Sequence, residues 1–144
     1  MMSRPKNLKD GIKYYFWKYI VSPVFPYIRD GLLKLRIIYH KGRQPYHIGF
    51  LDSKKKVEDF RRYLGGMGFR NNRFAWIDSD EILSMRIFDG YKHQYHIRLF
   101  KDREIRAHYE QTPEIHPFGH FFESVFEARS SEFKKYLGKW CFYK

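Results

Sequence analysis

Histidines are concentrated in one part of the chain. Five of the seven lie between residues 93 and 120, and the densest stretch runs from His108 to His120. An imidazole exchanges protons near neutral pH, and its neutral ring nitrogen binds transition metals. Acid–base catalysis and metal binding are therefore the two kinds of chemistry to weigh.

Metal binding has the right residue types and the wrong spacing. His108, Glu110, His116 and His120 offer ligands that suit Zn²⁺, Mn²⁺ or Fe²⁺. Their spacing matches no established zinc signature, and Pro117 interrupts any helix on which the last two histidines would share a face. We expect no metal and no other cofactor.

Acid–base chemistry on RNA is the alternative. A histidine could take a proton from a 2′-hydroxyl while arginines hold the phosphate and Glu110 orients an imidazole. The competing interpretation is a polar strand-to-helix junction, in which prolines set the corner and histidines cap backbone groups. The candidate catalytic residues are His96, His108, Glu110, His116 and His120.

Two adjacent predicted strands carry three of these candidates, His96, His108 and Glu110. Alternation puts Tyr95, Ile97 and Leu99 on one side of strand 93–100, and Ile105, Ala107 and Tyr109 on one side of strand 104–111. All six positions are odd, which rules out a two-residue turn and favours a three-residue loop at 101–103. This register sets His96 opposite His108 and Arg98 opposite Arg106.

The other face of this hairpin is then basic. The preceding strand, 82–88, sets Arg86 beside His96 by the same alternation. Two facing arginines are unfavourable by roughly 0.2–1 kcal/mol unless an acid or a bound anion lies between them. The candidate phosphate-binding residues are Arg86, Arg98 and Arg106. The alternative is the solvated outer face of an antiparallel sheet.

The whole pattern predicts an α+β fold. We expect an antiparallel meander sheet of about four to five strands packed against two helices, with an N-terminal amphipathic helical arm. Residues 1–45 form the arm and residues 46–144 the α+β domain. Strands are expected at 46–51, 73–78, 82–88, 93–100 and 104–111, and helices from an N-cap at Asp52 or Ser53, at 118–128 and at 131–141.

The segment from Tyr95 to Glu123 resembles the TumE-like toxins of prokaryotic toxin–antitoxin modules. The matching residues are Arg106, Tyr109, Glu110, Pro113, His116, Pro117 and His120. Glu110 stands where the family has an Asp-Asn pair. Where the family has two adjacent histidines, this sequence has a single histidine. The resemblance covers about one-fifth of the chain, and it implies a growth-inhibiting, ribonuclease-like role with an antitoxin partner.

The arm combines cations with aromatic rings. Apolar residues at helical spacing predict a helix over 8–21 that Pro23 and Pro26 stop, and residues 31–39 are expected to form a strand in preference to a second helix. Lys13, Trp17 and Lys18 are candidate contacts for unpaired bases or for an anionic membrane. The favoured alternative docks the apolar stripe on the body or on a second copy.

The net charge and the cysteine content limit the range of possible functions. The net charge is +12 and the pI about 9.8, a field that attracts polyanions. Cys141 is the only cysteine, which excludes an internal disulfide and indicates a reducing, cytoplasmic setting. No transmembrane or signal segment is expected.

Two hypotheses follow. The first is a nucleic-acid-binding protein, RNA favoured, with ribonuclease or toxin activity as its enzymatic form. The second is a non-enzymatic protein whose arm mediates homodimer assembly or peripheral membrane contact.

Overall fold

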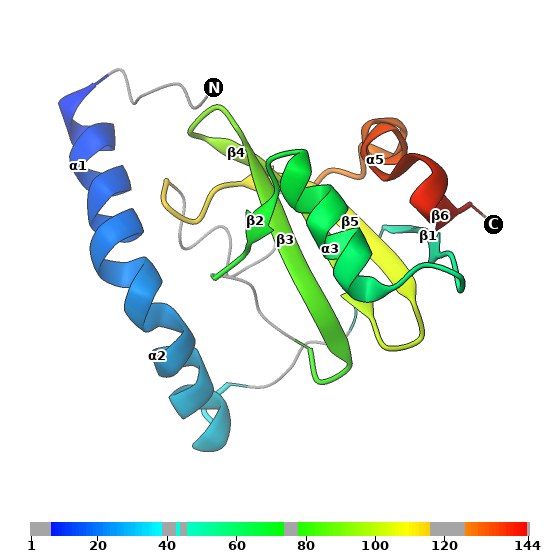
Figure 1. Ribbon diagram of the computed structural model, residues 1–144. Helices are drawn as coiled ribbons and strands as arrows, with labels where there is room; N and C mark the ends of the chain where they lie inside the picture. Colours follow the sequence, from blue (N-terminus) through cyan, green and yellow to red (C-terminus); the bar gives the residue numbers. More distant parts are fainter. Residues whose placement is uncertain (1–6, 39–42, 44–45, 74–77, 116–125, 144) are drawn as a thin grey trace.

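The protein folds around one antiparallel sheet of six strands in the order β2-β3-β4-β5-β1-β6 (Figure 1). The computed structural model describes residues 7–38, 43, 46–73, 78–115 and 126–143. The predicted α+β class is confirmed, with six strands where four to five were expected. The strands are β1 (His47–Leu51), β2 (Arg70–Asn71), β3 (Glu81–Asp89), β4 (His93–Phe100), β5 (Glu104–Gln111) and β6 (Cys141–Phe142).

The central hairpin has the predicted bounds and register. β4 pairs with β5 so that His96 lies opposite His108 and Arg98 opposite Arg106. β3 pairs with β4 so that Arg86 lies beside His96. Residues 101–103 form the loop, where Arg103 adopts a left-handed φ of 72°. Its guanidinium donates to the carbonyl oxygens of Leu51, Asp52 and Lys55, which ties the loop to the end of β1.

One face of the sheet carries the apolar core. The odd-numbered residues of β3, β4 and β5 point into it, as the alternation predicted. Two helices cover this face, α3 (Val57–Gly66) and α5 (Ser130–Leu137). They contribute Phe60, Leu64, Phe133 and Leu137, none of which is exposed.

Several predicted boundaries were wrong. α3 begins at Val57, with Lys56 as its N-cap, because the Asp52 carboxylate accepts a hydrogen bond from the backbone N–H of Lys54 and forms a turn of its own. Of the strand expected at 73–78, residues 74–77 lie outside the described part, and the edge strand is β2. The predicted helix 131–141 ends at Leu137, and a 3₁₀ turn (Gly138–Trp140) leads into β6.

The segment expected as a helix at 118–128 falls mostly outside the described residues. Its described end is not helical, because Glu127 forms a β-bridge with Tyr109.

The N-terminal helix runs through both prolines. It comprises α1 (Leu8–Phe16), a π-helical turn (Trp17–Val21) and α2 (Ser22–Lys34). Pro23 lies in the first turn of α2, where a missing N–H is tolerated, and Pro26 lies inside the helix without ending it. None of the helices formed by the described residues is both long enough and apolar enough to cross a bilayer.

The expected strand at 31–39 was also wrong over its described residues. The helix continues to Lys34 and ends in a Schellman motif, in which Ile37 N–H donates to the Leu32 carbonyl at 3.0 Å and Arg36 N–H to that of Leu33. Arg36 takes the left-handed φ of 56° that this motif needs.

The π turn keeps the two faces of the helix in phase. Ser22 and Arg29 follow Tyr14 by eight and fifteen residues. A π turn inserts one extra residue, and the remaining seven and fourteen are close to two and four turns of about 3.6 residues. Tyr14, Ser22 and Arg29 are accordingly all buried, together with Phe25.

Candidate functional site

The second face of the sheet gathers the polar residues that the register predicted. Even-numbered positions of three neighbouring strands contribute Ser84, Arg86, Gln94, His96, Arg98, Arg106, His108 and Glu110. The expectation that this face is open to solvent was wrong. His96, Arg98, His108 and Glu110 are each 4% exposed or less, and Gln94 is fully buried.

Acidic partners explain how two of the arginines are buried. Arg98 lies 2.7 Å from a carboxylate oxygen of Asp78 and 2.5 Å from one of Glu81. Arg86 forms a two-pronged pair with Glu114, at 2.8 and 3.2 Å, and donates to Gln94. Buried charges require such partners. Arg98 therefore forms buried ion pairs and is not accessible to a phosphate group.

Arg106 belongs to a second, partly exposed cluster around Glu104. The Glu104 carboxylate accepts from Arg106 at 2.9 Å, lies 2.7 Å from His47 Nδ1 and contacts Arg43. Burial alone would raise the pKa of Glu104, but the hydrogen bonds from these three partners outweigh it and lower the pKa below its usual 4.5. The predicted repulsion between Arg98 and Arg106 is relieved by separate acids.

His96, His108 and Glu110 form a compact triangle. His96 Nδ1 lies 3.2 Å from His108 Nε2, and the Glu110 carboxylate lies 3.5 Å from the first nitrogen and 3.4 Å from the second. Burial, the largest influence, lowers the pKa of His96 to about 3, so its ring is neutral.

Shorter hydrogen bonds hold the triangle from outside. The second nitrogen of His96 lies 2.8 Å from Ser84 Oγ, and the Gln94 amide donates to Glu110 at 2.6 Å. The Phe126 ring stacks on His108 with its centroid 4.1 Å away. The other two predicted catalytic residues, His116 and His120, lie outside the described part of the chain.

No protein-family model, curated protein or solved structure matches this chain. The resemblance to TumE-like toxins stays a prediction.

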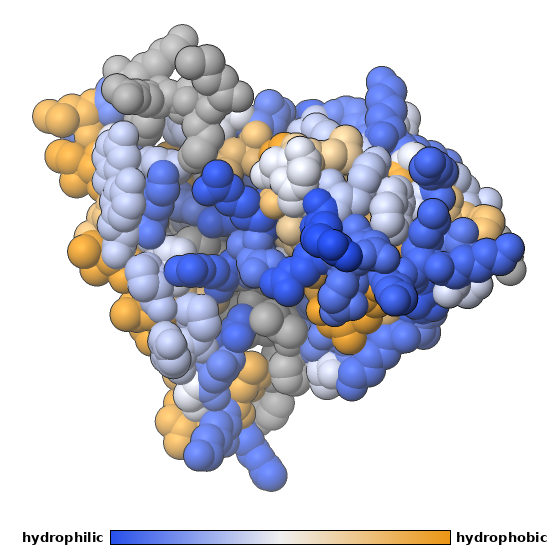
Figure 2. Space-filling model, in the orientation of Figure 1, coloured by the Kyte–Doolittle hydropathy of each residue, from blue (hydrophilic) through white to orange (hydrophobic). Residues whose placement is uncertain are grey.

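A cleft beside the second face is lined by several cationic side chains. It measures about 460 Å³ and opens between the N-terminal helix and the β2–β3 edge. Figure 2 shows hydrophilic side chains gathered between this helix and the sheet. The lining residues are Lys18, Tyr19, Ser22, Arg70, Asn71, Arg73, Arg86, Phe88 and Glu114.

The sequence reasoning found only part of this cleft. Lys18 and Arg86 were candidates. Arg73 was missed because residues 73–78 were assigned to a strand, and Arg70 because it falls between the predicted end of α3 and that strand. The signal was present in the sequence, where two arginines flank an Asn-Asn pair directly after the glycine-rich end of α3. Of the other predicted contacts on the arm, Lys13 is exposed outside the cleft lining, and Trp17 is half-buried.

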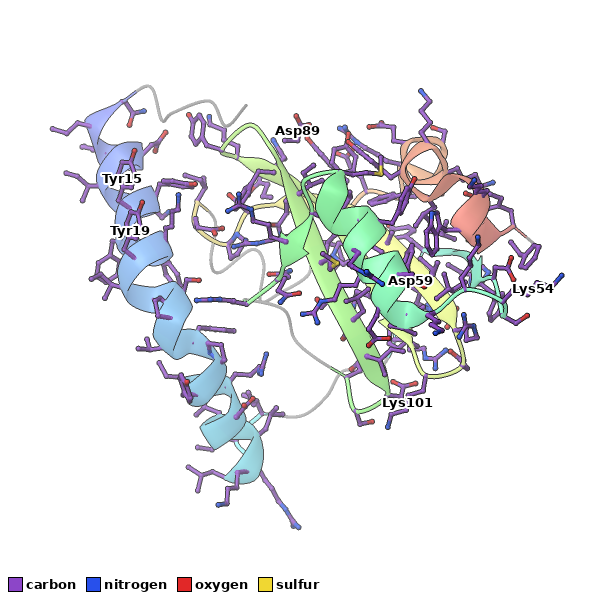
Figure 3. All side chains as sticks on the ribbon, viewed as in Figure 1. Tyr15, Tyr19, Lys54, Asp59, Asp89 and Lys101 are labelled. Atoms are coloured by element: carbon purple, nitrogen blue, oxygen red, sulfur yellow. The ribbon has the colours of Figure 1, made fainter. Side chains whose placement is uncertain are left out.

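The outer face of the N-terminal helix is apolar and exposed. The Tyr15 and Tyr19 rings stack on it, 6.0 Å apart (Figure 3). The apolar stripe of the arm, as we name this set, consists of Leu8, Ile12, Tyr15, Phe16, Tyr19, Ile20, Val24, Tyr27, Ile28, Leu35 and Ile37. The favoured expectation was docking of this stripe on the body or on a second copy. Docking on the body was wrong, because the buried side of the helix is the one with Tyr14 and Arg29. Docking on a second copy stays a prediction.

Proposed function

We propose that the protein binds single-stranded nucleic acid, RNA in preference to DNA, in the cleft between the N-terminal helix and the β2–β3 edge. The observation that carries the proposal is the cationic lining. Lys18, Arg70 and Arg73 face one small cleft, and among the described residues no carboxylate forms an ion pair with any of them. Glu114 is the one acid among the described lining residues, and Arg86 pairs with it.

The sheet register adds to the charge argument. Arg70 lies directly opposite Arg86 across the β2–β3 pair, an arrangement of like charges that costs stability in the absence of an anion. Only Arg86 has an acid among the described residues. A phosphate group placed against Arg70 would relieve the remaining repulsion.

The other lining residues suit unpaired nucleotides. Tyr19 and Phe88 supply rings on which bases can stack, a contact worth about 1–3 kcal/mol per base. Ser22 and Asn71 supply a hydroxyl and an amide, which can bond to a ribose 2′-hydroxyl and so distinguish RNA from DNA. A cleft of about 460 Å³ has the size of a small-ligand pocket and is too small for a duplex.

The proposal covers binding of nucleic acid and does not include its cleavage. A general base must lie within hydrogen-bonding reach of the proton that it removes. His96 and His108 are 4% and 2% exposed, and neither is among the described residues that line the cleft. The ribonuclease and antitoxin expectations therefore gain no support from the geometry of the described residues.

The test is a salt titration of RNA affinity, measured by fluorescence anisotropy with a short labelled single strand. Each phosphate contact with single-stranded nucleic acid contributes about −0.7 to the slope of log K against log salt. We expect Arg70→Gln/Arg73→Gln to flatten that slope by about 1.4 and to weaken binding at low salt.

The matched control is Lys54→Gln/Arg62→Gln, which removes the same number of charges from exposed positions away from the cleft. An equal loss in both double variants would show that binding follows net charge, and the cleft would be rejected. Comparison with DNA of the same sequence decides the preference for RNA.

A second candidate function is peripheral attachment to an anionic membrane through the apolar stripe of the arm. The specific observation is that this stripe is exposed and flanked by cations. Residues 1–45 contain 10 basic and 2 acidic side chains. Two such arms placed against each other would repel, whereas anionic headgroups attract both the lysines and the interfacial aromatic rings. This charge argument favours a lipid surface over a second copy.

A further inference from the structure

The triangle of His96, His108 and Glu110 has the composition of a metal site. All three are buried, and their ligand atoms lie within 4.8 Å of one another. Two imidazoles and one carboxylate are the protein ligands of one class of catalytic zinc site, in which a fourth position is held by water or substrate. The residues come from adjacent strands, so the sheet fixes their positions.

The spacing of the ligand atoms leaves room for one metal ion between them. With bonds of about 2.1 Å, neighbouring ligands lie about 3.4 Å apart in the tetrahedral arrangement that Zn²⁺ prefers. The two imidazole nitrogens, 3.2 Å apart, are close to this value. The Glu110 contacts come from two different oxygens, Oε1 at 3.5 Å from His96 and Oε2 at 3.4 Å from His108. With one oxygen as ligand, the three atoms lie within 4.8 Å of one another, so a tetrahedral ion requires a small movement of the carboxylate.

The strongest hydrogen bonds lie outside the triangle. Ser84 Oγ is 2.8 Å from His96 Nε2, the ring nitrogen that does not face the triangle. Gln94 donates to Glu110 at 2.6 Å. A metal-binding histidine is normally held by such a bond to its second nitrogen. Inside the triangle the contacts with the carboxylate are long for hydrogen bonds, at 3.4–3.5 Å.

We infer that the protein binds one Zn²⁺ ion, or a similar divalent transition metal, through His96 Nδ1, His108 Nε2 and the Glu110 carboxylate. With three protein ligands, one position is left for a water molecule. The inference does not rest on nucleic-acid binding.

The experiment titrates Co²⁺ into the full-length protein after dialysis against a chelator. Co²⁺ reports its geometry through visible absorption bands, which are intense for tetrahedral sites and weak for octahedral ones. We expect one Co²⁺ per chain with a tetrahedral spectrum that Zn²⁺ abolishes. No thiolate charge-transfer band is expected, because Cys141 lies in the apolar core on the opposite face.

Two variants and one control locate the site. His108→Gln and Glu110→Gln should each weaken Co²⁺ binding by at least about tenfold. His93→Gln should leave Co²⁺ binding unchanged. His93 lies on β4, the strand of His96, but it stacks on Tyr109 outside the triangle. In the wild type, Zn²⁺ at about 100 times its Kd should raise Tm by about 5–10 °C.

The inference is overturned if Co²⁺ gives no stoichiometric spectrum, if a thiolate band appears, or if both variants bind as the wild type does. Should His108→Gln fail to fold, Glu110→Gln decides, because it keeps the size of the side chain and an oxygen that accepts from Gln94. Thermal unfolding without metal checks the folding of each variant.

Discussion

At the scale of single residues, charge pairing decides which positive groups are available. Arg98 has two carboxylates within 2.7 Å, and removing one partner of a buried pair leaves the other charge uncompensated. Arg70 and Arg73 lie at the surface instead. The sequence showed on which face of the sheet the arginines of the hairpin lie, because side chains alternate between the two faces along a strand. It did not show the pairing, because Asp78, Glu81 and Glu114 come from segments outside the alternating pattern.

Glu104 gives a residue-scale prediction about pH. Its pKa lies below the usual 4.5 in the folded protein, since three cationic partners outweigh burial. Its contribution to stability is therefore complete above the unfolded pKa and is lost as the pH falls through the folded pKa. We expect Glu104→Gln to destabilise the protein at pH 7 and the difference from the wild type to shrink steadily below pH 4.5.

Urea denaturation at a series of pH values measures this difference. Glu58→Gln, which removes one carboxylate from an exposed position of α3, serves as the control. A constant difference between Glu104→Gln and the wild type from pH 7 to acid pH would contradict the assignment.

At the scale of elements, the hairpin was predictable, and the N-terminal helix was predicted correctly over residues 8–21 but not beyond them. Alternation and loop length together admit one register for β4 and β5, so both strands were located to the residue. Pro23 and Pro26 gave a misleading stop. Pro23 lies in the first turn of α2, where a proline costs little, and Pro26 lies inside the helix without ending it. The π turn that precedes them has no sequence signal that we could have used. β6 was missed because two residues are too short to show alternation.

Gly49 and Gly65 give an element-scale prediction. A Cβ at Gly49 would overlap the Phe142 carbonyl oxygen and Cys141 Sγ, so β1 and β6 can pair this closely only with glycine there. A Cβ at Gly65, in α3, would meet no atom within 4 Å. We expect Gly49→Ala to cost about 1–3 kcal/mol and Gly65→Ala to add about 0.5–1 kcal/mol.

The free energy of unfolding in urea tests both changes under one set of conditions. Equal stabilities for the two variants would show that β6 does not pack against β1 as described. Loss of β6 alone would appear as increased susceptibility of the C-terminus to carboxypeptidase in Gly49→Ala.

At the scale of the whole molecule, charge is divided unevenly. Residues 1–45 carry +8 and residues 46–144 carry +4. Four of the acids in the second part are used inside the protein, against arginines of the second face. The composition predicted a strongly basic arm correctly. It could not predict that the arm presents an apolar side to solvent, since that depends on which side of the helix meets the body.

The vesicle prediction belongs to this scale. We expect Ile12→Asn/Ile28→Asn to weaken binding to vesicles of phosphatidylserine and phosphatidylcholine by at least about tenfold, because both side chains are more than half exposed on the apolar stripe of the arm. Met67→Asn/Ile82→Asn, at exposed apolar positions of the body, is the matched control. Co-sedimentation measures the affinity.

Two results would reject the membrane proposal. One is equal binding by both double variants, and the other is a wild-type dimer in analytical ultracentrifugation that Ile12→Asn/Ile28→Asn dissociates. The second result would assign the stripe to self-association instead.

The extra residue in the π turn has a consequence for how a ligand would be found. It keeps Tyr14, Ser22 and Arg29 on one side of a continuous rod and most of the stripe on another, with Tyr19 shared between the stripe and the cleft. If both proposals hold, a molecule held at a bilayer by its stripe would search for nucleic acid along a surface, in two dimensions rather than three.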